Sequence, residues 1–220
     1  MDITGLKGTE NSDIYIIGSG SSLDYIPKSF FQDKVTIGVN TAYNHVPCKY
    51  TICHHYCVLQ PIIDSGETIV VTSEYESCVL NSCIRGFKGP YKHDGTYENV
   101  PYLPLKGTYY YYKHLDQGFE SIKIVDKDGW LTAGGTIVTE AIHFAYFLGA
   151  KNIILCGVDG GFIDGKTNVT GYSTPTNRDH MKNVQKQLEQ ISSWVRGRRV
   201  PVMSINPFIN FTLEGHHFTL

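Results

Sequence analysis

Asp-Ile-Tyr-Ile-Ile-Gly-Ser-Gly-Ser-Ser-Leu, residues 13–23, is a short apolar run followed by small residues. The run 13–17 has the length and β-branched character of a buried strand. The glycines that follow let the backbone approach a ligand closely, and the first amides of a following helix would face an anion. Leu23 replaces the third glycine of a dinucleotide-binding fingerprint, and no Lys-Ser/Thr pair completes a P-loop. A ligand loop is favoured here, although the segment alone also suits a plain strand–helix turn.

Similar apolar runs recur along the chain and predict the fold class. Further strands are expected at 35–39, 50–53, 68–72, 152–156 and 201–205. One helix is expected to be opened by Thr132–Thr136 and to run to about Leu148, where Gly149 ends it, and a second is expected over 179–195. The strands are short and apolar on both faces, as a buried parallel sheet requires. Their alternation with helices predicts an α/β protein with a single doubly wound, mostly parallel, modified Rossmann-like sheet.

Residues 81–130 differ from the rest of the chain. They are rich in Gly, Pro, Tyr and charged residues, and Tyr109–Tyr112 is a run of four tyrosines. We interpret this stretch as a Tyr-rich insertion or active-site loop region that carries an antiparallel ribbon. A length of 220 residues fits one domain over 1–220 with that insertion.

Composition excludes several classes of protein. The net charge of −2 does not indicate a nucleic-acid or membrane binder. No apolar run approaches the roughly 18 residues of a membrane span. Met1–Asn11 lacks the apolar stretch of a signal peptide, so we expect a cytoplasmic protein with reduced cysteines. Assembly into a homo-oligomer is left open.

Ligands of open α/β sheets bind beyond the carboxyl ends of the strands. Asn40, the pair His54-His55 and Asp159 each follow a predicted strand. Asp159 suits a ribose hydroxyl or a metal, although an aspartate before two glycines is also common in turns. Thr132–Thr136 brings two glycines to a helix start, which admits a phosphate or a sugar but also fits a plain capped helix.

Histidines supply candidate bases. His54 and His55 are interpreted as a general base or ligand contacts, with surface histidines as the alternative. The nearby Cys53 and Cys57 have the loose spacing of a zinc pair, but no second pair is evident, so we predict no metal site. Arg178 and His180 lie at the start of the last helix, where arginine would neutralise phosphate. A solvated helix start explains them equally well.

The ordered combination of these segments resembles two related groups of proteins. Its parts are Ile16–Leu23, Asn40, Gly134-Gly135-Thr136 and Leu148–Asp159, which reads Leu-Gly-Ala-Lys-Asn-Ile-Ile-Leu-Cys-Gly-Val-Asp. One group is the bacterial family 42 sialyltransferases, which use a CMP-sugar donor. The other comprises glycosyltransferase-associated proteins related to 6-hydroxymethylpterin diphosphokinase-like enzymes. The resemblance spans about residues 13–210, without a confident match over 60–130.

The resemblance implies a role for each matching residue. Gly18, Gly20, Ser21 and Ser22 would line the donor nucleotide and its phosphate. Asn40 and Asp159 would lie beside the nucleotide, and Gly134, Gly135 and Thr136 beside the phosphate or donor sugar. The sialyltransferases carry a histidine base just ahead of the last long helix, where this chain has Tyr172 nearest and His180 a few residues later.

We therefore expect a glycosyltransferase that moves a sugar from a nucleotide-sugar donor to an acceptor hydroxyl on a glycan or another molecule. No tightly bound cofactor is expected, and a role for Mg²⁺ is left open. Two alternatives remain. One is a Mg²⁺-dependent diphosphokinase acting on a pterin-like alcohol with ATP, with Asp159 as a metal ligand. The other is a non-catalytic nucleotide or sugar sensor on the same fold.

Overall fold

The computed structural model describes residues 1–53, 56–73, 88–91, 97–99, 105–115, 122–160, 163, 165–171 and 178–205. For residues 56–58, 88–91, 97–99 and 178–181 it describes the backbone alone.

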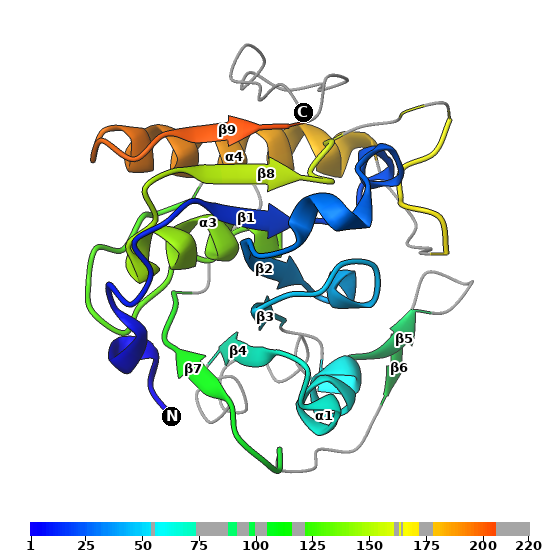
Figure 1. The fold of residues 1–220 in the computed structure, drawn as a ribbon, viewed down its shortest axis with the longest axis horizontal. Helices are drawn as coiled ribbons and strands as arrows, with labels where there is room; N and C mark the ends of the chain where they lie inside the picture. Colours follow the sequence, from blue (N-terminus) through cyan, green and yellow to red (C-terminus); the bar gives the residue numbers. More distant parts are fainter. Residues whose placement is uncertain are drawn as a thin grey trace.

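Seven parallel strands form the main sheet and confirm the predicted fold class. Their order is β7 (Tyr110–Tyr112), β4 (Ile69–Ser73), β3 (Tyr50–Ile52), β2 (Val35–Val39), β1 (Ile14–Ile17), β8 (Ile153–Cys156) and β9 (Val202–Ser204). Figure 1 shows them side by side from β9 at the top to β7 near the bottom. Residues that stack well on a pleated surface, mainly Ile and Val, fill these strands because the sheet is covered on both faces.

The chain changes direction across the sheet at β1. From β1 it steps outward through β2, β3 and β4, and it later returns to the other side of β1 as β8. Ile17, the last residue of β1, lies beside Gly38 of β2 and Cys156 of β8. The carboxyl ends of β1 and β8 therefore form the topological switch point, where ligands of open α/β sheets bind.

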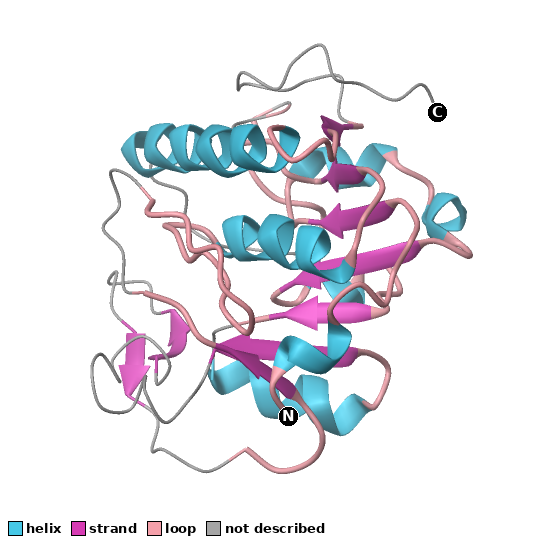
Figure 2. Ribbon diagram, turned by 90° about the vertical axis from the view of Figure 1, so that its left-hand side faces the viewer, coloured by secondary structure: helices cyan, strands magenta, loops and turns pink. Residues whose placement is uncertain are grey.

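Two long helices cover one face of the sheet. They are α3 (Ile137–Leu148) and α4 (Arg178–Arg196), which lie together on one side in Figure 2. Ile14 and Ile16 of β1 pack in one core cluster with residues of both helices, including Phe144 and Leu188. Each helix leads into the amino end of the next strand, so its own N-terminus lies toward the carboxyl edge of the sheet.

The opposite face is covered by shorter elements. They are the 3-10 helices η2 (Ser21–Tyr25), η3 (Lys28–Phe31) and η4 (Ala42–Asn44) and the helix α1 (Tyr56–Ser65). Ile17 packs with Leu23 of η2 and Phe31 of η3, whereas Leu59 and Ile62 of α1 form a separate cluster. A further 3-10 helix, η1 (Ile3–Leu6), precedes β1.

The predicted insertion is partly correct and partly wrong. An antiparallel ribbon is present, in which β5 (Lys88–Tyr91) pairs with β6 (Tyr97–Asn99). However, Tyr110–Tyr112 is β7, an edge strand that pairs in parallel with β4 in the main sheet. Partial burial explains the difference, because Tyr112 is fully buried in the core while Tyr110 and Tyr111 stay half-exposed.

Helix ends follow local capping. The segment Thr132–Thr136, expected to open the first long helix, leads directly into α3, which begins at Ile137 with Thr136 as its N-cap; the Thr136 hydroxyl accepts from the Val138 amide. The predicted end is confirmed, because Gly149 adopts φ 93° and its amide closes the last turn.

Candidate ligand site at the carboxyl edge of the sheet

Glycines bring the loops after β1 and β8 into direct contact. The Gly18 amide donates to the Cys156 carbonyl and the Gly20 amide to the Gly157 carbonyl, each at 2.7 Å. A Cβ atom on Gly20 would lie 2.6 Å from the Gly157 oxygen and from Asp159 Oδ2. Cβ atoms in proteins do not approach other atoms as closely as 2.6 Å. The two loops can therefore lie this close together only because residue 20 has no side chain.

Asp159 occupies the position at which we expected an anionic ligand. Its side chain is 2% exposed, and Oδ2 accepts from the Ser22 amide at 2.8 Å and from the Ser21 hydroxyl at 3.4 Å. The Ser22 hydroxyl bonds to the other carboxylate oxygen. The carboxylate thereby caps the start of η2, where amide groups attract negative charge. An anionic ligand at the start of η2 would be repelled by the negative charge of the Asp159 carboxylate.

A segment after β8 closes over the same loop. The Ser21 hydroxyl donates to the Lys166 carbonyl at 3.0 Å, and the Val169 amide donates to the Ser19 carbonyl at 2.8 Å. As a result Ser21 and Ser22 are buried, whereas Ser19 and Gly20 stay half-exposed. Within the glycine loop, a ligand therefore has access to the Ser19–Gly20 backbone.

Asn40 has two features of a ligand-contacting residue. It follows β2 in the left-handed region, with φ 53°, a conformation that is uncommon for any residue but glycine. Its side-chain Oδ1 is buried and accepts no hydrogen bond from the described residues. Buried polar atoms are normally paired, and strained backbone concentrates at functional sites. Asn40 is thus the predicted residue whose geometry points most directly to a ligand.

A side chain of α4 contacts the turn that precedes α3. Gln187 of α4 is fully buried and its Oε1 accepts from the Gly135 amide at 2.6 Å. A Cβ atom on Gly134 would lie 2.7 Å from Thr139 Oγ1 and 2.9 Å from Gln187 Oε1. Gly134, Gly135 and Thr136 themselves remain half-exposed. These residues therefore form an accessible turn on a rigid support.

Glu140 is a buried acid in the first turn of α3. It is 1% exposed, and the Thr139 hydroxyl donates to its Oε2 at 2.8 Å. Burial raises the pKa of Glu140 from 4.5 to about 8, so the carboxyl is largely protonated at neutral pH. Our sequence reasoning missed Glu140 and Gln187. A signal existed for Glu140, which lies three residues after Ile137 and four before Phe144 on the apolar face of the helix.

The predicted site residues divide into four groups. Those at the carboxyl edge with an accessible surface are Gly20, Asn40, Gly134, Gly135 and Thr136, and those buried beneath them are Gly18, Ser21, Ser22 and Asp159. The backbone of Arg178 and His180 forms the first turn of α4 at the same edge, but their side chains lie outside the described structure. His54, His55 and Tyr172 lie outside the described residues.

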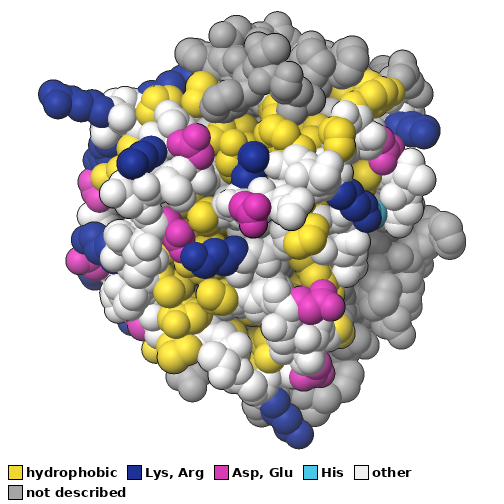
Figure 3. Space-filling model, in the orientation of Figure 1, with side chains coloured by type: hydrophobic (Ala, Val, Ile, Leu, Met, Phe, Trp, Pro, Cys, Tyr) yellow, Lys and Arg dark blue, Asp and Glu magenta, His cyan; other side chains and the backbone are white. Residues whose placement is uncertain are grey.

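Surface charge is mixed on the face drawn in Figure 3, where basic and acidic side chains are interspersed. In the described part of the chain, no three His, Cys, Asp or Glu side chains are grouped so that they could hold a metal ion. None of the described helices is long and apolar enough to span a membrane.

Comparison with known proteins gives one structural similarity. No protein-family model and no curated protein matches the chain. The fold is similar to that of the sialyltransferase CstII from Campylobacter jejuni, whose structure was determined with the substrate analogue CMP-3FNeuAc. The match covers 94% of this chain and 89% of that chain, with 13% sequence identity and a TM-score of 0.45. A similarity of this size does not decide the activity of the chain.

Proposed function

We propose that the protein is a glycosyltransferase that binds a nucleotide-sugar donor at the carboxyl edge of its sheet. The observation that supports this most is the convergence of separate segments. The turn after β1, Asn40 after β2 and the Gly134–Thr136 turn come from distant parts of the sequence and meet at one edge. These are the segments whose order resembles nucleotide-sugar transferases.

Accessible groups at this edge suit the parts of a nucleotide sugar. The Asn40 side chain, which is half-exposed as a whole, would hydrogen-bond to the base or to a ribose hydroxyl. The Ser19–Gly20 backbone and the Gly134–Thr136 turn would lie along the phosphate and the donor sugar. Gly18, Ser21, Ser22 and Asp159 would act indirectly, since they hold the glycine loop in place.

The reaction requires a base and stabilisation of a leaving phosphate. The base takes the proton of the acceptor hydroxyl while that oxygen bonds to the anomeric carbon. The bond from this carbon to the phosphate oxygen breaks, and the nucleotide leaves with the electron pair. We propose His180 as the base, with His54 and Tyr172 as alternatives and His55 as a donor contact. Thr136, amides at the start of α3 and Arg178 would stabilise the leaving phosphate.

A ligand screen followed by a donor assay tests this function. We expect one of CMP, CDP, UDP or GDP to raise the melting temperature, because binding to the folded state stabilises it. The matching nucleotide sugar should then be hydrolysed slowly without an acceptor. Stabilisation by ATP with strict Mg²⁺ dependence would favour a diphosphokinase instead. Nucleotide binding without turnover of any donor would favour a sensor.

A further inference from the structure

A second pocket lies on the sheet face that α3 and α4 leave uncovered. It has a volume of about 530 Å³ and is lined by residues of η3, the segment 43–48 and the turn before β4. Cys48 in its wall packs against Gly38, where a Cβ atom would lie 2.8 Å from the Cys48 sulfur. Ile37 and Val39 pack with α3 on the other face, so Gly38 and the pocket face away from that helix. No residue of the candidate donor site lines this pocket.

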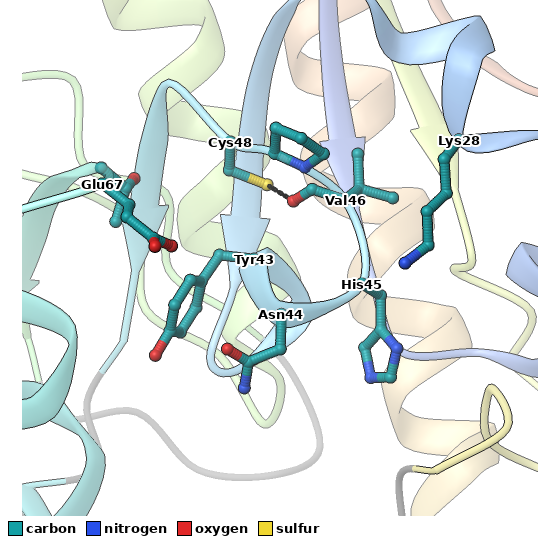
Figure 4. A pocket seen from close by; sticks show the side chains of 9 residues that line it. Lys28, Tyr43, Asn44, His45, Val46, Cys48 and Glu67 are labelled. Carbon is teal, nitrogen blue, oxygen red and sulfur yellow. Dashed lines mark hydrogen bonds between the residues drawn. The ribbon is translucent and has the colours of Figure 1, made fainter. Parts of the chain in front are cut away.

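Opposite charges stand on opposite walls of the pocket. Figure 4 shows Lys28 on one side and Glu67 on the other, with Tyr43 and His45 between them. Within the described structure neither Lys28 nor Glu67 forms an ion pair. Both side chains are exposed, and they come from η3 and from the turn that precedes β4. Each charge is therefore available to a ligand.

The Glu67 wall suits a cationic group. Tyr43 packs against both cores of this face, which holds its ring in place. Burial and the nearby Glu67 carboxylate raise the pKa of the Tyr43 hydroxyl. A carboxylate beside an aromatic ring attracts an ammonium group through its charge and through the ring. On the other wall the Lys28 ammonium attracts an anion.

We propose that this pocket binds a small zwitterion, with its anionic group at Lys28 and its ammonium group at Glu67 and Tyr43. The volume lies within the range of about 300–1,000 Å³ that is usual for small-molecule sites. A ligand with both charges can interact with Lys28 and with Glu67 at the same time, whereas a simple anion or amine can interact with only one of them. The inference does not depend on the proposed sugar transfer, because the two sites share no residue.

Calorimetric titrations with four probes test the proposal. Phosphoethanolamine and 4-aminobutyrate carry both charges, with a phosphate or a carboxylate as the anion, while inorganic phosphate and ethanolamine carry one each. We expect at least one zwitterion to bind more tightly than either single-charge probe. Lys28→Gln and Glu67→Gln should each weaken that binding about two- to fivefold, as for exposed charge pairs.

Lys186→Gln is the matched control, because Lys186 is an exposed lysine on α4, away from the pocket. It should bind the zwitterion as the wild type does. The proposal is overturned if neither zwitterion exceeds the single-charge probes, if Lys28→Gln and Glu67→Gln bind like the wild type, or if Lys186→Gln weakens binding equally.

Discussion

At the scale of single residues, the glycine loop shows why a local pattern can be recognised while its physical role is misjudged. Gly18-Ser19-Gly20-Ser21-Ser22 predicts close approach of the backbone to another group, and that approach occurs. The partner is Asp159, more than 130 residues away, whose carboxylate accepts from Ser22. Nothing in the spacing of residues 18–23 indicates a contact at that separation. The sequence therefore predicts the loop and its location, but not which group accepts hydrogen bonds from it.

Gly20→Ala tests this contact. The added methyl group would lie 2.6 Å from the Gly157 oxygen and from Asp159 Oδ2, so the loops must separate. We expect a loss of about 1–3 kcal/mol in the free energy of unfolding, as for overpacked sites. Chemical denaturation measures it. Gly5→Ala is the control, because a Cβ atom there meets nothing within 4 Å. An equal effect of the two substitutions would contradict the role given to Gly20.

Asn40→Gly separates ligand binding from stability. Glycine retains the left-handed backbone, and the substitution removes the buried Oδ1 that has no partner among described residues. We expect unfolding free energy to change little. Affinity for the nucleotide identified by the screen should fall about two- to tenfold, the worth of one hydrogen bond. Calorimetric titration measures the affinity, and undiminished binding would remove Asn40 from the site.

His180→Ala tests the proposed base. An acceptor hydroxyl is a poor nucleophile until its proton is removed, and histidine has an unperturbed pKa near neutrality. We expect turnover to fall by roughly 10²–10⁴-fold, with little change in donor affinity. The measurement is kcat with the acceptor, alongside donor Kd. If His180→Ala keeps full turnover while His54→Ala or Tyr172→Phe loses it, the role of general base belongs to the residue whose substitution lowers turnover.

At the scale of elements, apolar patterning predicts the strands that are buried on both faces and the two long helices, but misses the edge strand β7 and the helix α1. The strand predicted at 35–39 has those bounds, and the other five predicted strands agree within about one residue at each end. β7 was not predicted because a run of tyrosines lacks the apolar alternation of a sheet strand. Helix α1 was not predicted either, and Pro61 within it interrupts the helical pattern.

The first turn of α3 carries a pH-dependent contribution to stability. The pKa of Glu140 is about 8 in the folded protein and near 4.5 when unfolded, so the folded state binds the proton more tightly. Stability from this group is therefore lost as pH rises from about 4.5 through about 8. Burial lowers the pKa of His143 to about 4, and its contribution changes in the opposite sense below pH 6.5. Above pH 6.5 the contribution of Glu140 is therefore separated from that of His143.

Glu140→Gln should remove most of the loss of stability between pH 6.5 and 8.5. Glutamine keeps the shape of the protonated carboxyl and cannot ionise. Urea denaturation at several pH values measures the slope for each protein. Glu189→Gln, at an exposed position on α4, should leave the slope unchanged. A slope in Glu140→Gln equal to that of the wild type would contradict the burial of an ionisable acid at this turn.

At the scale of the whole molecule, topology accounts for the position of the candidate site. The doubly wound order places the carboxyl ends of β1 and β8 at the switch point, and the N-termini of α3 and α4 face the same edge. Sequence reasoning predicted this edge because polar or small residues follow each strand. Gln187 was beyond it, since its contact with Gly135 depends on how α4 packs against the start of α3.

The most direct test of nucleotide-sugar binding at this edge is an NMR titration that follows backbone amide shifts of the whole chain. The ligands are the nucleotides of the screen and the matching nucleotide sugar. We predict saturable shifts concentrated at Ser19, Gly20, Asn40, Gly134 and Gly135. Small shifts are expected at Lys28, Asn44 and Glu67, in the second pocket. No saturable shift with any nucleotide, or shifts confined to the second pocket, would contradict the account.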